Sequence, residues 1–130
     1  MELKVLSKKI SEMSKKFGIR YAILFGSYAK GRKTEESDID IALKLKRHPN
    51  NLFKFLKDFV DELGIEGVDV VILNSAPNTL KFEIFRNGVV LFCEDKEEYF
   101  NDLLSMIKWY DDWHLIKKYF EKRELKKVSG

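Results

Sequence analysis

Three aspartates stand where two short apolar segments could bring them together. Asp38 and Asp40 are separated by Ile39 at the start of one apolar run, and Asp69 lies inside another, residues 68–73. Side chains two residues apart on a strand point to the same face, so Asp38 and Asp40 would share a face while Ile39 joins the core. If the two strands are neighbours, the three carboxylates form one acidic site.

Such an acidic site would be unstable without bound cations. Two carboxylates about 5 Å apart repel by roughly 3 kcal/mol at an effective dielectric constant near 20, against a total stability of about 5–15 kcal/mol. Carboxylate oxygens are hard ligands that suit Mg²⁺ or Mn²⁺. The pattern therefore predicts a divalent-metal site, although a lone Asp-x-Asp pair also occurs at solvated strand ends.

A glycine-containing segment before the aspartates is suited to binding phosphate. The apolar run 21–25 ends at Gly26 and Ser27, and Lys30 and Gly31 follow. Glycine allows close approach and positive φ, and a serine at a helix N-terminus presents a hydroxyl and unpaired N–H groups to phosphate. Lys30 either neutralises a triphosphate or keeps the loop soluble. A metal site facing such a turn indicates phosphoryl or nucleotidyl transfer.

The remaining hydrophobic periodicity predicts an α/β (α+β) fold in which a small mixed sheet is flanked by helices. The segment 68–73 is short, β-branched and nearly all apolar, so we expect it to be a buried strand. The pattern predicts strands at 19–25, 39–45, 68–73 and 89–93, and helices at 3–17, 52–63, 77–87 and 94–127.

The last predicted helix, 94–127, carries more apolar surface than docking on one domain requires. A surface helix normally needs a single apolar stripe. The second stripe predicts a surface for a partner protein or for a second copy of the chain, and one broad face wrapped around the core is the alternative. One stripe comprises Phe100, Leu103, Ile107 and Tyr110, and the other Met106, Trp109, Trp113, Ile116 and Phe120.

Composition limits the class of protein. A chain of 130 residues without a repeat or linker predicts a single domain, 1–130. No apolar run approaches the roughly 20 residues of a membrane span, and the lone Cys93 predicts a reducing, cytoplasmic location. The net charge of +3, from 24 basic and 21 acidic residues, is too balanced to predict direct nucleic-acid binding.

These motifs resemble the nucleotidyltransferase superfamily that includes DNA polymerase beta. Within it, the chain is similar to the minimal nucleotidyltransferases, the MNT antitoxins that accompany HEPN toxins. The resemblance covers nearly the whole chain, and its most specific parts are residues 25–31, 37–40 and 68–74. Lys30 departs from the family, which more often has arginine there, so the charge is kept but the two-pronged guanidinium is lost.

The resemblance implies a polymerase beta-like fold with a long C-terminal helix. It also implies Mg²⁺-dependent transfer of AMP from ATP to a tyrosine hydroxyl of a cognate HEPN ribonuclease toxin, which is thereby neutralised. Asp38 and Asp40 would hold two Mg²⁺ ions (or Mn²⁺) at the triphosphate. Asp69 would bind the metal on the acceptor side and help to deprotonate the hydroxyl. Gly26 and Ser27, with Lys30 and Gly31, would bind the nucleotide.

Three other functions stay open from the sequence. One is an enzyme that adenylylates a small molecule, as aminoglycoside-modifying relatives do, but the chain has no added substrate domain. Another is an antitoxin that blocks its toxin by binding alone, and three acids that are costly without metal count against it. The last is a nucleotide-binding regulator.

Overall fold

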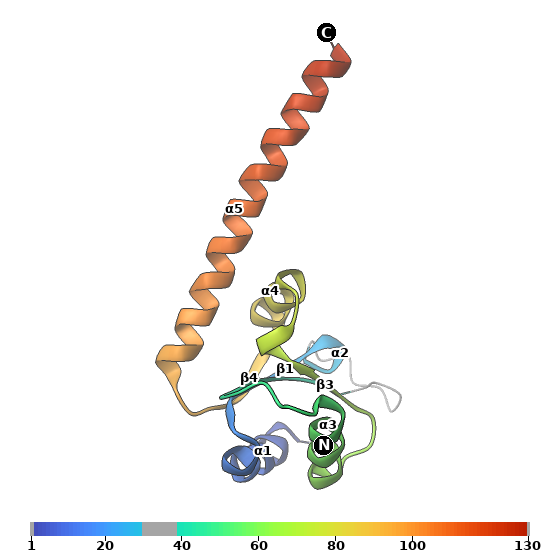
Figure 1. Cartoon of the computed structure of the whole chain (residues 1–130), viewed down its shortest axis with the longest axis vertical. Helices are drawn as coiled ribbons and strands as arrows, with labels where there is room; N and C mark the ends of the chain where they lie inside the picture. Colours follow the sequence, from blue (N-terminus) through green and yellow to red (C-terminus); the bar gives the residue numbers. More distant parts are fainter. Residues whose placement is uncertain (1, 30–38, 130) are drawn as a thin grey trace.

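The computed structural model describes residues 2–29 and 39–129, with residues 27–28 and 123–129 described by their backbone alone. Within these described ranges four strands form one mixed sheet in the order β3-β2-β1-β4 (Figure 1). β1 is antiparallel to both β2 and β4, whereas β2 and β3 are parallel. The strands are β1 (Ile19–Phe25), β2 (Ile39–Leu45), β3 (Val68–Ile72) and β4 (Val89–Cys93).

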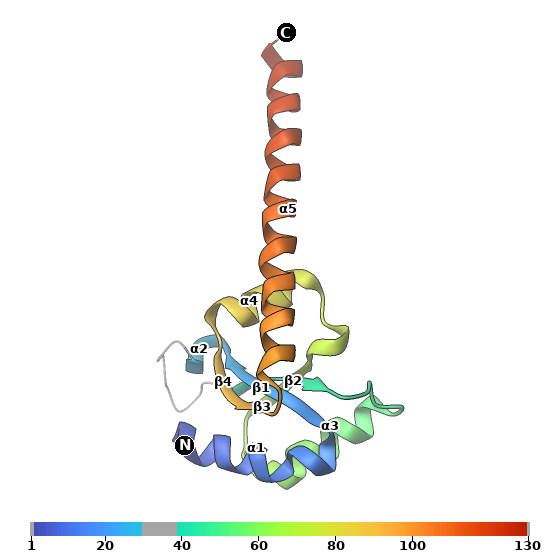
Figure 2. The same ribbon diagram turned by 90° about the vertical axis from the view of Figure 1, so that its left-hand side faces the viewer.

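Helices cover both faces of this sheet. α1 and α3 lie on one face, and α4 with the first turns of α5 lies on the other (Figures 1 and 2). The helices are α1 (Leu3–Phe17), α2 (Gly26–Ala29), α3 (Leu52–Leu63), α4 (Asn78–Asn87) and α5 (Lys96–Ser129), with a 3₁₀ turn, η1 (Leu73–Ser75), after β3. The predicted mixed sheet flanked by helices is confirmed. None of the described helices is long and apolar enough to cross a bilayer.

Local capping signals explain where the helices of the first layer begin and end. α1 ends at Gly18 and α3 at Gly64, both in the left-handed conformation with φ of 64° and 69°. The Asn51 side chain accepts a hydrogen bond of 3.1 Å from the Lys54 N–H at the start of α3. These boundaries agree with the sequence prediction.

Alternation along β1 and β2 divides the apolar residues between two cores. Ala22, Leu24, Ile41 and Leu43 face α1 and α3, whereas Tyr21, Ile23 and Ala42 face α4 and α5. Asp40, two residues before Ala42 on β2, therefore lies on the second face.

The prediction of a buried strand at 68–73 is wrong in two respects. Among the described residues β3 is an edge strand that pairs only with β2, and of its five residues only Ile72 is buried. The strand also stops at Ile72, because Leu73 begins the 3₁₀ turn. An edge position leaves one flank uncovered, so an apolar run there is half-exposed, and Asp69 is exposed to solvent.

α5 packs against the sheet and α4 only near its start. Tyr99, Leu103 and Met106 contact the second core, and the Tyr110 ring stacks on Phe82 with centroids 4.3 Å apart. Beyond these residues the helix projects away from the other elements (Figures 1 and 2). The two predicted stripes therefore do not divide as expected, because each has both partly buried and exposed members. Phe100, Ile107, Trp113, Ile116 and Phe120 are all exposed.

Candidate active site

Two of the three predicted acids are direct neighbours in the sheet. In the parallel pairing of β2 with β3, Asp40 is the register partner of Asp69. Register partners on adjacent strands lie about 4.8 Å apart and share a face. Ile39 and Ile41 point to the opposite face and are buried in the first core. The expected juxtaposition of the two strands is thus observed, with Asp40 partly buried and Asp69 exposed.

Gly26 lies against the Asp40 carboxyl group. Phe25, the last residue of β1, is the register partner of Asp40, and Gly26 follows it with φ of +75°. A Cβ atom at position 26 would lie 2.2 Å from Asp40 Oδ2 and 3.2 Å from its Cγ. A side chain here would displace the Asp40 carboxyl group, and the positive φ also favours glycine.

The other predicted site residues are less fully described. Ser27 follows Gly26 in α2 and is described by its backbone. Asp38, Lys30 and Gly31 lie outside the described residues. Within residues 2–29 and 39–129 no group of three His, Cys, Asp or Glu side chains is placed to hold a metal ion, and the acid pair of Asp40 and Asp69 is what this part of the chain contributes.

The acid pair fits a hard divalent cation. Asp40 and Asp69 supply carboxylate oxygens from neighbouring strands, and like charges at this spacing favour a bound cation. The absence of a side chain at Gly26 lets the backbone of the turn lie directly against the Asp40 carboxyl group. These two residues would hold the ion, which would supply charge neutralisation for a phosphate ligand.

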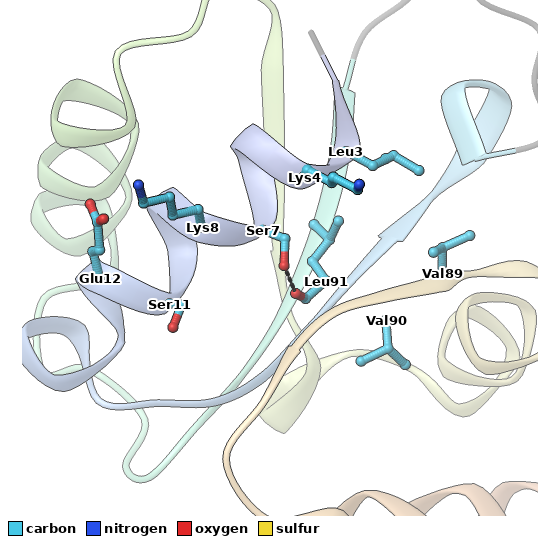
Figure 3. A pocket seen from close by; sticks show the side chains of 9 residues that line it. All are labelled: Leu3, Lys4, Ser7, Lys8, Ser11, Glu12, Val89, Val90 and Leu91. Carbon is cyan, nitrogen blue, oxygen red and sulfur yellow. Dashed lines mark hydrogen bonds between the residues drawn. The ribbon is translucent and has the colours of Figure 1, made fainter.

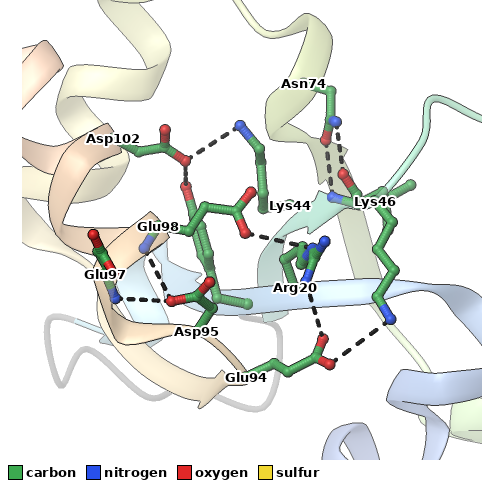
Figure 4. A network of polar contacts seen from close by, with 11 residues as sticks. Arg20, Lys44, Lys46, Asn74, Glu94, Asp95, Glu97, Glu98 and Asp102 are labelled. Carbon is green, nitrogen blue, oxygen red and sulfur yellow. Dashed lines mark hydrogen bonds and ion pairs between the residues drawn. The ribbon is translucent and has the colours of Figure 1, made fainter.

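A polar cluster on the same sheet face fixes α5 to the strands that carry the site. The Tyr21 hydroxyl donates a hydrogen bond of 2.6 Å to Asp102 Oδ2, and Lys44 Nζ lies 3.2 Å from the same oxygen (Figure 4). Burial, followed by the hydrogen bond and charge of Asp102, raises the pKa of Tyr21 well above its usual range. Tyr21 is on β1 and Lys44 is on β2, so the base of α5 is tied to both strands.

Sequence reasoning missed this cluster and a second contact that fixes the end of β2. Asn74 Oδ1 accepts a hydrogen bond from the Leu45 N–H, and Asn74 Nδ2 donates one to the Leu45 carbonyl, each at 2.9 Å (Figure 4). The pair joins η1 to β2 and so stabilises the alignment of β2 with β3. Asn74 stood within the stretch 68–74 that carried the resemblance, but nothing in the sequence indicated its partner.

A shallow depression between α1 and β4 lies away from the acid pair. Its lining includes Lys4, Lys8 and Ser7 from α1 and Leu91 from β4 (Figure 3). The Ser7 hydroxyl donates to the Leu91 carbonyl, so α1 partly covers this edge of the sheet. β4 is at the opposite edge from β3, so this depression is separate from the candidate active site.

Comparisons with known families and curated proteins agree with this geometry. The family model described as "Polymerase beta, Nucleotidyltransferase" matches residues 8–97, a range that includes the Gly26 turn and both acids. The protein adenylyltransferase MntA of Thermococcus cleftensis is 31% identical over 87 residues, which are 65% of this chain and 87% of that protein.

Solved structures resemble the chain over a longer range. A chain from the complex of tri-AMPylated Shewanella oneidensis HEPN toxin with MNT antitoxin has a TM-score of 0.69 at 20% identity, covering 95% of this chain and 99% of that one. A chain from a toxin–antitoxin crystal structure with AMP-PNP has a TM-score of 0.70 at 22% identity, covering 92% of this chain and 98% of that one. At these identities the likeness concerns the fold.

Proposed function

Because the chain belongs to the polymerase beta nucleotidyltransferase family, whose members generally use divalent metal, we propose that it adenylylates a HEPN toxin. In this proposal the chain transfers AMP from ATP to a tyrosine hydroxyl of the toxin and acts as its antitoxin. The pairing of Asp40 with Asp69 beside Gly26 is the observation that carries the proposal. The relatives that are named as a protein adenylyltransferase and as an MNT antitoxin support the choice of acceptor.

In this proposal some residues of the site bind the nucleotide and its metal ion, and Asp69 acts on the acceptor side. Asp40, together with Asp38, would hold the metal ion at the triphosphate, and Asp69 would hold a second ion on the acceptor side. Two Mg²⁺ ions, when bound, would neutralise the triphosphate and stabilise the charge of the departing pyrophosphate. Gly26 and Ser27 would accommodate the phosphates, since position 26 offers backbone without a side chain.

The transfer itself is a substitution at the α-phosphorus. The acceptor oxygen forms a bond to this phosphorus as the bond to the α–β bridging oxygen breaks, and pyrophosphate leaves with the electron pair. The hydroxyl proton passes to the Asp69 carboxylate and then to solvent. Asp69 suits this role because its exposed side chain stands on the edge strand β3.

An open edge also favours a protein as the acceptor. β3 pairs with β2 on one side only, and among the described residues no strand lies beyond it. A large acceptor could therefore approach Asp69 from the side of β3 without a cleft that encloses it. The predicted cytoplasmic location and the predicted homo-oligomer through the terminal helix stay predictions.

The proposal is tested by measuring the mass of the acceptor protein. The chain is incubated with the HEPN toxin proposed as its acceptor, ATP and Mg²⁺, and the intact mass of this toxin is measured by mass spectrometry. We expect the added mass of one or more AMP groups, located on tyrosine by fragmentation. The same reaction with Asp40→Asn should give no added mass, because the variant lacks a charged metal ligand.

Two outcomes would contradict the proposal. If the HEPN protein stays unmodified but its ribonuclease activity is blocked equally by the wild-type chain and by Asp40→Asn, the chain acts by binding alone. If AMP appears on an aminoglycoside supplied in the same reaction and not on the protein, the acceptor is a small molecule.

A further inference from the structure

The projecting part of α5 exposes large apolar side chains that its own domain does not cover. We call residues 113–122 the distal segment. Its five large apolar side chains are between 44 and 68% exposed: Trp113, Leu115, Ile116, Tyr119 and Phe120. Figures 1 and 2 both show this part of the helix standing away from the sheet and from α4. Apolar surface gathered in this way is typical of an interaction site.

The apolar side chains of the distal segment form one broad face with basic borders. At 100° per residue they span an arc of about 160° from Leu115 to Trp113. Lys117 stands beside Trp113, with its Nζ 5.3 Å from the indole ring. Lys122 and Lys118 stand beside Leu115 at the other border, where they line a shallow surface with Tyr119 and Glu121. A complementary partner would have an apolar groove with carboxylates along both rims.

The distal segment gains stability by docking. A helix of this length is marginal in water when nothing packs against it, and among the described residues the ring contacts of α5 with α4 end at Trp109 and Tyr110. Burial of the apolar face in a groove would remove this surface from water.

The charge of the distal segment argues against a second copy of the chain as the partner that covers its apolar face. Residues 113–122 contain three basic residues and one acidic residue, a net charge of +2. Two such helices packed along their apolar faces would bring like charges together, whereas an acidic groove would neutralise them.

The distal segment and the acid pair lie on the same side of the sheet. Asp40 lies on the sheet face that α4 and α5 cover, as do its alternate neighbours Ala42 and Lys44. α5 is fixed to this face through Asp102. A protein held by the distal segment therefore lies on the side to which the carboxylates point.

We propose that the distal segment is the docking helix for the acceptor protein, which receives it in an apolar groove rimmed by carboxylates. The inference rests on the proposed function, since the docked protein is the one that carries the acceptor hydroxyl. Docking keeps the acceptor near the site between successive transfers, so it lowers KM more than it changes kcat.

A binding measurement without ATP tests the docking helix. The probe is the HEPN toxin proposed as the acceptor, immobilised and titrated with wild-type chain and two triple variants. The distal variant is Trp113→Ser, Ile116→Ser and Phe120→Ser. The matched control, Phe100→Ser, Leu104→Ser and Ile107→Ser, removes three equally exposed apolar side chains nearer the sheet. We expect Kd to rise at least about 100-fold for the distal variant and less than about threefold for the control.

Two further readouts make the test specific. Hydrogen exchange of residues 113–122 should slow when the HEPN protein binds, and Lys117→Glu with Lys122→Glu should weaken binding and reduce its salt dependence. Equal affinities for both triple variants, or no binding of the wild-type chain, would overturn the proposal. So would a wild-type dimer that the distal variant converts to monomer. If binding behaves as expected and no AMP is transferred, the docking helix stands and the proposed function fails.

Discussion

Replacing Gly26 by alanine tests whether the turn and the Asp40 carboxyl group form one site. The new Cβ would lie 2.2 Å from Asp40 Oδ2, and contacts under 3.0 Å essentially do not occur. The carboxylate must therefore retreat by roughly 0.8 Å, and misplacement of a catalytic group by about 1 Å can cost about 10²-fold in rate. We expect kcat/KM for AMP transfer to fall about 100-fold in Gly26→Ala.

Gly18→Ala is the matched control for this substitution. Gly18 also has positive φ, +64°, but the nearest atom to its added Cβ is Lys46 Cβ at 4.0 Å. Both variants should lose about 1 kcal/mol to backbone strain, which lowers Tm by about 3–6 °C for a domain of this size. Only Gly26→Ala should lose activity.

The assay is AMP transfer to the HEPN protein at a temperature at which both variants are fully folded, with Tm measured in parallel. The reasoning is refuted if Gly26→Ala keeps wild-type kcat/KM. It is equally refuted if Gly18→Ala loses as much activity, because the effect would then come from strain and not from Asp40.

Three other substitutions test the metal site and the contacts around it. Asp69→Asn should abolish the rise in Tm that Mg²⁺ with AMP-PNP gives the wild-type chain, as measured by differential scanning fluorimetry, and should reduce transfer at least about 10²-fold. Tyr21→Phe should lower the free energy of unfolding by about 1.5–3 kcal/mol at pH 7, since a charge-assisted hydrogen bond is lost. The pKa of Tyr21 is raised in the fold, so its contribution is complete below pH 10 and falls by up to about 1.4 kcal/mol per pH unit above it. Urea titrations should show that the deficit of Tyr21→Phe shrinks between pH 10 and pH 11, and a constant deficit would contradict this account. Asn74→Ala leaves two backbone groups of Leu45 without their partner, so it should lower the free energy of unfolding by about 1–3 kcal/mol. The rate of AMP transfer at 20 °C should stay within about threefold of wild type. Unchanged stability in urea would show that the hydrogen bonds between Asn74 and Leu45 contribute nothing.

The sequence predicted the parts of the fold that depend on local signals. Gly18 and Gly64 mark helix ends because they adopt positive φ, and Asn51 marks a helix start through its side-chain acceptor. The alternation along 39–45 predicted the face on which Asp40 lies, whereas its pairing with Asp69 was conditional on the two strands being neighbours, which the structure shows.

What the sequence could not supply depends on contacts between distant elements. The exposure of Asp69 follows from the edge position of β3, and strand order is a property of the whole chain. The Tyr21–Asp102 hydrogen bond joins residues 81 positions apart, and neither residue type indicates the other. The exposure of the distal segment depends on how far α4 reaches along α5. The sequence of α5 alone does not show which of its turns α4 will cover.

A crystal structure with AMP-PNP and Mn²⁺ tests the central claim most directly. Mn²⁺ gives an anomalous signal that locates the ion independently of the protein phases. We predict an anomalous peak between the carboxylates of Asp40 and Asp69, with the triphosphate beside Gly26 and Ser27. Nucleotide bound elsewhere, or Mn²⁺ coordinated without either carboxylate, would contradict the assignment of this site.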